Sequence, residues 1–378
     1  MDLKTLCVHG SRKKYDTTGA ISVPIFQSAT FAHPGVGKST GYDYSRQQNP
    51  TREHLEITIA ALEGGTDALA FPTGMAALTA MMELFSPDDH VIVSDDLYGG
   101  SFRLFFNISV KNGLKFSLVN TSDAEAVEAA ITPKTKAVFI ETPTNPMMQV
   151  TDIAAVAKIA GQRNILTVVD NTFLTPCRQR PLALGADIVL HSGTKYLGGH
   201  NDTLAGFLVF KSAETSERMR FIYKTTGACL SPFDSWLLIR GIKTLALRVE
   251  RQEENAGKIV AWLSERPYVK NIYYPGLKTH PQYEVSRRQA SGFGAMISFE
   301  AKSAAIAVRL LERVRVFQYA ESLGGTESLI TYPMLQTHAD VPEEEREAKG
   351  INDRLLRMSV GIEDVGDLVR DLEQAFGG

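Results

Sequence analysis

Short apolar strands alternate with helical segments through the middle of the chain, and this alternation restricts the fold more than any other feature. Strands are predicted at residues 90–95, 115–119, 135–141, 165–170, 186–191 and 204–210, with amphipathic helices between several of them, as at 123–131 and 152–161. Strands that are almost continuously apolar are buried on both faces. Their alternation with helices predicts a mainly parallel sheet that is covered by helices on each side.

The pattern changes after about residue 230, which predicts a second domain. A long helical stretch at 231–265 is followed by predicted strands at 269–274, 295–299 and 355–360 and by helices at 303–312 and from residue 364. The length of 378 residues also exceeds the roughly 250–300 residues at which a single core usually stops growing. We therefore expect a large domain at 56–230 and a smaller C-terminal α/β domain at 231–378.

Residues 1–55 show little periodicity and many turn-forming residues, as in HPGVGKSTGYDYSRQQNPTRE. A long irregular segment in a compact protein is usually a functional loop or a linker. This segment is predicted to be an arm that is either loose or held by a partner.

The charge and composition of the chain argue against some classes of function. The formal net charge is −3, which gives no electrostatic reason to expect nucleic acid or an anionic membrane as a partner. There is no run of ~18 apolar residues that would span a bilayer, and the N-terminus lacks the apolar core of a signal peptide. Cys7, Cys177 and Cys229 form no CxxC motif and are expected to be reduced thiols. We expect a cytoplasmic protein without a metal site.

The segment SGTKYLGGH, residues 192–200, directly follows a predicted strand and contains Lys195. The carboxyl ends of strands are where open α/β sheets bind ligands. Considered alone, Lys195 is equally well explained as a surface lysine beside glycines that turn the chain.

Asp170 ends the preceding predicted strand, in VVDNTF. An acid at that position is often only a turn former or a helix cap. An acid and a lysine on neighbouring strand ends also suit pyridoxal 5′-phosphate (PLP), because the lysine forms a Schiff base and the acid keeps the pyridine nitrogen protonated.

Two weaker signals fit the same cofactor. Gly74, in FPTGMAAL, precedes a helix whose first N–H groups would bind a phosphate. Tyr98, in DDLYGG, follows a predicted strand and would stack on a flat ring, although considered alone it is better explained as a packing residue.

Together these segments resemble the Cys/Met-metabolism family of PLP enzymes, which includes cystathionine γ-synthase, cystathionine γ- and β-lyase and methionine γ-lyase. The resemblance covers nearly the whole chain, with YDYSRQQNPTRE, TGMAA, DLYGGSFRLF, ETPTNP, VVDNTF, HSGTKYLGGH, AESLGGTESL and LLRMSVGIED in this order. It implies PLP-dependent fold type I (aspartate-aminotransferase-like), with a large, mainly parallel sheet domain and a smaller C-terminal α/β domain.

The resemblance also implies roles for residues around the cofactor. Lys195 would form the Schiff base and move protons between substrate carbons, Asp170 would pair with the pyridine nitrogen, and Tyr98 would stack on the ring. The phosphate would be held by the backbone of Gly74 and Met75, by the hydroxyls of Ser192 and Thr194, and by Tyr44 and Arg46 of a neighbouring subunit. The implied assembly is a homo-oligomer, a dimer of dimers, whose contacts order the N-terminal arm.

For the substrate, the resemblance implies that Arg357 binds the carboxylate with help from Asn145 and Ser322. The bidentate geometry of arginine suits that task. Tyr44 would donate a proton to the leaving group.

Three departures from the family pattern bear on the reaction. Methionine γ-lyases typically have a cysteine at the position of Gly100, which counts against that activity. β-Lyases often have an aromatic residue at the position of Glu321, whereas Glu321, Asp43 and Arg103 are more similar to the γ-synthase and γ-lyase members. TGM replaces the commoner SGM and should leave the backbone contacts to phosphate intact.

The expected function is therefore that of a transsulfuration enzyme acting at Cγ of an amino acid, a cystathionine γ-lyase or a γ-synthase that uses O-acylhomoserine plus cysteine. Cystathionine β-lyase is the first alternative. A non-catalytic PLP-binding regulatory protein is an alternative of another class, and an aminotransferase fits the motifs poorly.

Overall fold

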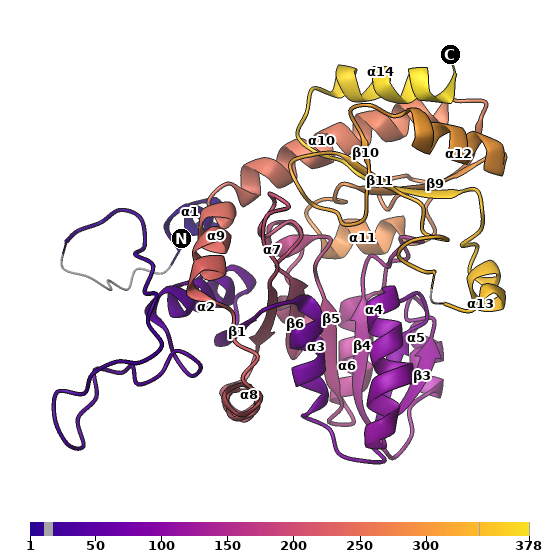
Figure 1. Ribbon diagram of the computed structural model, residues 1–378. Coiled ribbons are helices and arrows are strands. Elements are labelled where there is room, and N and C mark those ends of the chain that lie inside the picture. Colours follow the sequence, from indigo (N-terminus) through magenta and orange to yellow (C-terminus); the bar gives the residue numbers. More distant parts are fainter. Residues whose placement is uncertain (11–17, 340, 378) are drawn as a thin grey trace.

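The computed structural model describes residues 1–10, 18–339 and 341–377. Two sheets organise the described chain (Figure 1). The larger has seven strands in the order β1-β7-β6-β5-β4-β2-β3, and the smaller has five in the order β10-β11-β12-β9-β8. The strands of the large sheet come from residues 67–210 and those of the small sheet from 269–359. The domain boundary near residue 230 stays a prediction, and this distribution agrees with it.

The large sheet is mainly parallel, which confirms the predicted fold class. Its strands are β1 (Asp67–Phe71), β2 (His90–Ser94), β3 (Lys115–Val119), β4 (Thr135–Glu141), β5 (Leu166–Asp170), β6 (Ile188–Ser192) and β7 (Gly206–Phe210). Only β7 runs antiparallel to its neighbours, β1 and β6. β1 was not predicted from the sequence.

Alternate residues of the strands enter two separate cores, one on each face of the sheet. In β4, Val138 and Ile140 belong to the core that also contains Val156 of helix α6 (Ile153–Gly161). Ala137 and Phe139 belong to the other core. That second core contains residues of α3 (Gly74–Met82), whose N-terminal end is capped by the Thr73 hydroxyl. Burial on both faces explains why these strands are almost continuously apolar.

Further helices complete the large part of the molecule. They are α2 (Pro50–Glu63), α4 (Gly99–Arg103), α5 (Ala124–Ala129), α7 (Thr175–Arg178) and α8 (Ala213–Thr226).

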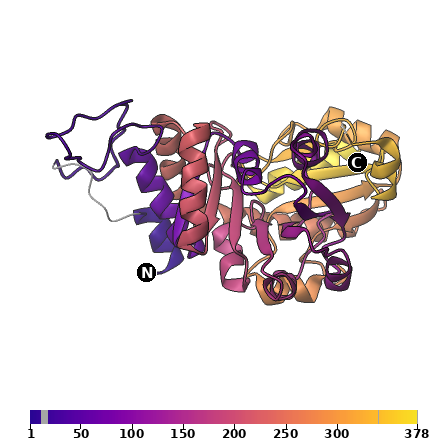
Figure 2. The same ribbon diagram turned by 90° about the horizontal axis from the view of Figure 1, so that it is seen from below.

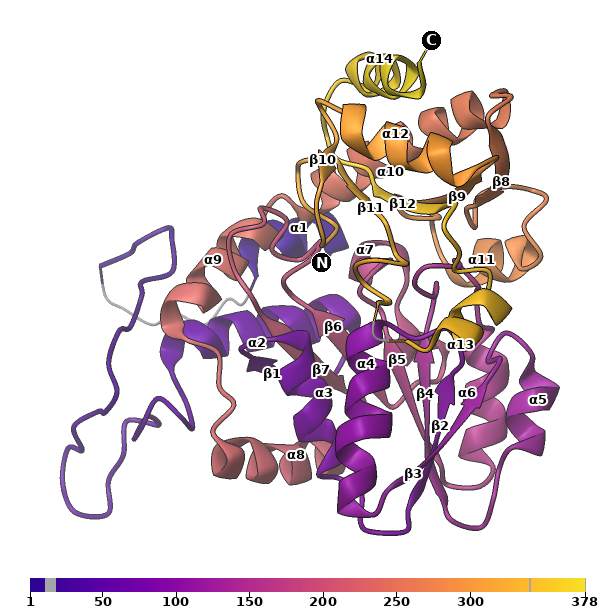
Figure 3. The ribbon, with the colours of Figure 1, turned by 45° about the vertical axis from the view of Figure 1, so that its right-hand side comes forward.

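The small sheet is mostly antiparallel and is covered by long helices (Figure 3). Its strands are β8 (Val269–Tyr273), β9 (Met296–Ala301), β10 (Gln318–Tyr319), β11 (Leu329–Thr331) and β12 (Leu355–Ser359). The helices of this part are α11 (Tyr283–Gln289), α12 (Ala304–Arg313), α13 (Glu343–Ala348) and α14 (Val365–Phe376). The sequence predicted β8, β9, β12, α12 and α14, but not the very short β10 and β11.

The helical stretch predicted at 231–265 is two helices, α9 (Pro232–Ile242) and α10 (Leu245–Ser264). The break follows from the bonds made by the Gly241 carbonyl. It accepts from the Thr244 N–H and from Nη2 of Arg248, so the last turn of α9 closes instead of continuing.

The N-terminal region contains more regular structure than was predicted for residues 1–55. Helix α1 (Leu3–His9) packs against α2 and α10, and α2 begins at Pro50. Between them, residues 18–49 contain neither helix nor strand and extend away from the body of the molecule (Figure 2). Residues 11–17 of the predicted arm lie outside the described residues.

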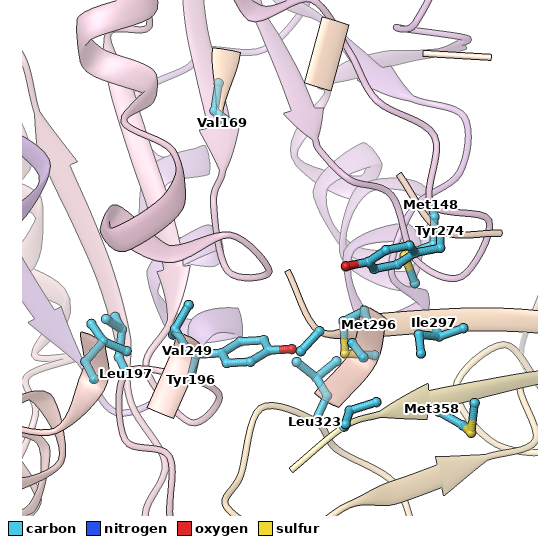
Figure 4. Packing of buried hydrophobic residues seen from close by; sticks show 14 of the residues in the cluster. Met148, Val169, Tyr196, Leu197, Val249, Tyr274, Met296, Ile297, Leu323 and Met358 are labelled. Atoms are coloured by element: carbon cyan, nitrogen blue, oxygen red, sulfur yellow. The ribbon is translucent and has the colours of Figure 1, made fainter. Parts of the chain in front are cut away.

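The two sheets share one buried core where the parts of the molecule meet. The cluster that contains Val169 of β5 also contains Met296 of β9 and Met358 of β12, and the Tyr196 ring and Leu323 lie beside Met296 (Figure 4). Because Tyr196 follows Lys195, this packing fixes the lysine-bearing turn to the small sheet. None of the described helices has the length and apolarity needed to cross a membrane.

One buried carboxylate in the small part is expected to stabilise the fold. Asp371 of α14 is buried and accepts hydrogen bonds from the backbone N–H groups of Arg315, Val316 and Phe317, at 2.8, 2.8 and 2.9 Å. Asp371→Ala should lower the free energy of unfolding by about 2–4 kcal/mol, because buried donors lose their acceptors. The shift in the urea midpoint measures it. Asp367→Ala, at an exposed position of the same helix, should shift the midpoint far less, and equal shifts would contradict the prediction.

Candidate active site

A cavity of about 390 Å³ lies at the carboxyl ends of β4, β5 and β6 and is bordered on the other side by residues of the small part. It brings together most of the residues that the sequence singled out. These are Gly74, Met75, Tyr98, Asn145, Asp170, Ser192, Thr194, Lys195, Glu321, Ser322 and Arg357. Their individual roles stay predictions.

Lys195 lies three residues after the end of β6, and its side chain reaches across to the small part. Its Nζ donates a hydrogen bond to the Ser322 hydroxyl at 2.9 Å. Burial lowers the pKa of Lys195 to about 8, and the nearby Arg357 guanidinium adds to this effect. An amine with such a pKa is neutral often enough near pH 7 to act as a nucleophile or a base.

Two acids end neighbouring parallel strands beside this lysine. Glu141 of β4 and Asp170 of β5 are partners in the register of the sheet. Glu141 is buried, and its pKa rises to about 8 because of burial and the nearby Asp170. Asp170 is only half-buried at the cavity wall, yet the surrounding protein still raises its pKa by desolvation. Two desolvated acids side by side favour a cation in the cavity, and the protonated ring nitrogen of PLP fits that requirement.

Glu141 was missed in the sequence, although it ends an apolar strand as Asp170 does. Its carboxylate accepts hydrogen bonds from the Tyr98 N–H and the Ser101 hydroxyl, both at 2.9 Å. Tyr98 immediately precedes α4 and is exposed along the cavity wall. Glu141 therefore links the acid pair to the tyrosine that was predicted to stack on the cofactor ring.

The N-terminal end of α3 faces the end of β6. A Cβ atom on Gly74 would lie 3.1 Å from Cβ of Ser192, so only glycine allows this approach without displacement. A Cβ atom on Gly206 would overlap the Thr73 carbonyl, so β7 also lies in close contact with the residue that precedes α3. A helix N-terminus flanked by the Ser192 and Thr194 hydroxyls suits a phosphate group.

Arg357 lies in the middle of β12 and is buried. Its Nη1 donates to Asn145 Oδ1 at 2.9 Å, and its Nη2 donates to the Ser322 carbonyl at 3.1 Å and to the Thr331 hydroxyl at 3.2 Å. Its Nε has no hydrogen-bond partner among the described residues. Burial lowers the pKa of Arg357 to about 10. A desolvated guanidinium at a cavity wall suits the carboxylate of an amino acid.

Four predicted site residues are not among those that line this cavity. Asp43, Tyr44 and Arg46 belong to the irregular stretch 18–49, where the Arg46 guanidinium lies 5.6 Å from the centre of the Tyr44 ring and donates to the Lys224 carbonyl. Arg103 is the last residue of α4. Thr73, Ser101, Glu141, Thr172, Phe173 and Thr337 also line the cavity but were not predicted. Thr337 follows no strand, so no strand-end signal marked it.

Comparisons with known proteins agree with this site. A family model described as Cys/Met metabolism PLP-dependent enzyme matches residues 4–377. The chain is 50% identical over 376 residues to cystathionine gamma-lyase of Bacillus subtilis, covering 100% of this chain and 99% of the relative. It is 50% identical over 375 residues to cystathionine gamma-synthase of Haemophilus influenzae (99% and 97% covered) and 48% identical over 374 residues to cystathionine beta-lyase of Lactococcus lactis (99% and 98%).

A solved structure of cystathionine gamma-lyase from Lactobacillus plantarum superposes with a TM-score of 0.98 at 46% identity, covering 100% of this chain and 98% of that chain. The fold type, the cofactor and the enzymatic nature expected from the resemblance are thereby confirmed, and the non-catalytic alternative is set aside. The lysine, the acids and the N-terminal end of α3 fit PLP, and the chain belongs to the Cys/Met-metabolism family of PLP-dependent enzymes.

Proposed function

We propose that this enzyme breaks or forms the carbon–sulfur bond of cystathionine and acts at Cγ, either as a γ-lyase or as a γ-synthase that joins O-acylhomoserine and cysteine. The observation that carries the proposal is the position of Glu321. This carboxylate is exposed, lines the cavity beside Lys195 and lies in the small part near the buried Arg357. Arg357 can bind the carboxylate at one end of an amino acid, and Glu321 can attract an ammonium group at the other end. The cavity therefore suits an amino acid that is charged at both ends.

The relatives support this class of substrate and leave one alternative. The γ-lyase and the γ-synthase are each 50% identical to this chain, and the β-lyase is 48% identical. β-Cleavage of cystathionine is therefore the second candidate, and the relatives do not separate it from γ-cleavage.

In the proposed mechanism Arg357, Asn145 and the Ser322 segment bind the substrate carboxylate and direct the Cα hydrogen towards Lys195. When bound, PLP withdraws electrons from the substrate through its protonated ring. The Lys195 amine takes the Cα proton, and its lowered pKa favours this step. γ-Chemistry needs a second proton transfer at Cβ by the same amine. Tyr44 of a second copy donates a proton to the leaving group.

The N-terminal arm is proposed to bind a second copy of the chain, within a dimer of dimers. Ile21 and Val36 are 96% and 106% exposed, which is costly for apolar side chains unless a partner covers them. The same contact would bring Tyr44 and Arg46 to a neighbouring cavity. A cytoplasmic location is also proposed, and the three free cysteines support it.

Lys195→Ala should remove the covalent link between the protein and PLP and lower turnover at least about 100-fold, because the proton-transferring amine is lost. Borohydride reduction followed by peptide mapping measures the link. Lys211→Ala, at an exposed lysine outside the cavity, should keep both the link and the activity. Covalent PLP in the Lys195→Ala protein would contradict the assignment.

Mixing two inactive variants tests whether the arm acts on a neighbour. Refolding Arg46→Ala with Lys195→Ala should restore up to about a quarter of the wild-type activity, since half of the dimers carry one intact site. Lys195→Ala mixed with Asp170→Ala is the matched control, because both residues line one cavity, and it should stay inactive. The same inactivity in the Arg46 mixture would show that the arm serves its own chain.

The products formed from cystathionine distinguish cleavage at Cγ from cleavage at Cβ. γ-Cleavage gives cysteine, 2-oxobutyrate and ammonia, whereas β-cleavage gives homocysteine, pyruvate and ammonia and would overturn the assignment to Cγ. Glu321→Ala should lower kcat/KM for the charged substrate about fivefold, the effect of one exposed charge pair, and change kcat/KM for methionine less. Glu312→Ala, exposed on α12, should leave both values unchanged.

A further inference from the structure

The connection between β11 and β12 is much longer than the sheet requires. The two strands are antiparallel neighbours, and Thr331 pairs with Arg357. A short turn would join them, but the described residues 332–339 and 341–354 instead leave the small sheet and include α13, which lies over the carboxyl-end side of the large sheet (Figures 1 and 3). We refer to residues 332–339 and 341–354 as the excursion.

His338 connects the excursion to two walls of the cavity. It is buried, and its Nε2 lies 3.0 Å from the Asn145 carbonyl oxygen and 3.3 Å from the Leu97 carbonyl oxygen. A carbonyl oxygen only accepts, so Nε2 must carry the hydrogen and is shared between the two. The other nitrogen, Nδ1, is 2.8 Å from the Thr337 hydroxyl. Burial lowers the pKa of His338 to about 4, so the imidazole is neutral near pH 7 and Nδ1 accepts from that hydroxyl.

The Leu97–Tyr98 peptide group is held from both sides by these contacts. Its carbonyl accepts from His338, and its N–H donates to Glu141. Because a peptide group is planar, fixing both of its polar atoms fixes the plane of the group and, within it, the Cα atom from which the Tyr98 side chain extends.

Asn145 is also held at two points. Its backbone carbonyl accepts from His338, and its side-chain oxygen accepts from Arg357. Arg357 lies on β12, just beyond the end of the excursion. Asn145 therefore connects the excursion to the guanidinium that is proposed to bind the substrate carboxylate.

Close packing leaves the excursion little freedom at this point. A Cβ atom on Gly99 would overlap the Thr337 carbonyl oxygen, so the excursion lies directly on the first residue of α4. Thr337 lines the cavity, whereas the neighbouring His338 does not.

We propose that His338 is a positioning residue, which holds Tyr98 and Asn145 in fixed relation to each other and thereby sets the affinity of the site for the PLP ring and for the substrate carboxylate. The inference rests on the proposed roles of Tyr98 and Arg357. His338 acts only through these residues and does not touch the reacting atoms.

Two substitutions separate this role from general stability. His338→Leu removes the shared donor and should raise KM for the amino-acid substrate about tenfold, with a smaller change in kcat. It should also weaken PLP binding and alter the visible circular dichroism of the bound cofactor, which depends on how the ring is held. His338→Gln places an amide N–H near the position of Nε2 and should restore most of KM and of the dichroism.

A matched control is available in the connection between β8 and α11. His280 Nε2 lies 3.0 Å from the Met148 carbonyl oxygen, and neither residue lines the main cavity. His280→Leu also removes a histidine bond to a carbonyl and should lower thermal stability while leaving KM and the dichroism unchanged. If His338→Leu behaves in the same way as His280→Leu, the positioning role is wrong.

A further variant keeps the proposal testable if the His338→Leu protein misfolds. If His338→Leu does not fold, His338→Asn replaces it, because its shorter side chain cannot reach both carbonyls. Asn should then show the losses and Gln the recovery, and equal behaviour of Asn and Gln would overturn the proposal. PLP affinity and dichroism do not depend on the reaction that the enzyme catalyses. A product pattern of β-cleavage would therefore refute the assignment to Cγ and leave this test intact.

Discussion

Four charged side chains are withdrawn from water between the carboxyl ends of β4, β5 and β6 and the small sheet, and the properties of the site depend on their burial. Glu141 and Asp170 have raised pKa values, and Lys195 and Arg357 have lowered ones, because the protein desolvates all four. Each of these groups favours an oppositely charged ligand group more strongly than it would in water. The two cores on either side of the sheet provide the burial that makes this possible.

The sequence predicted the strands best where burial is two-sided, because their residues are apolar without interruption. Lys195 and Asp170 were found for the same reason, since each lies at or just after the end of such a strand. Glu141 carries the same signal and opens the ETPTNP motif, but its link to Tyr98 and Ser101 depends on contacts that only the folded chain provides. The break between α9 and α10 depends on a bond from the Arg248 side chain to the Gly241 carbonyl seven residues earlier, which the apolar periodicity of the stretch does not reveal.

Other parts of the site could not be predicted because they depend on contacts between distant segments. His338 and Thr337 lie in a turn-rich stretch, and only the folded chain brings them to Leu97 and Asn145. For Tyr44 and Arg46, the sequence resemblance suggested a role that a single chain does not display. In the proposed assembly, the surface of a second copy of the chain would determine where these two side chains lie.

The contact between Gly99 and the Thr337 carbonyl has a consequence for how such an enzyme diversifies. Two segments more than half the chain apart meet with no space for a single methyl group. A lengthened or shortened excursion would tilt the start of α4, and with it the wall that carries Tyr98. New substrate preferences in this architecture would therefore require paired changes at both segments, and random insertion into the excursion would more often inactivate the enzyme than redirect it.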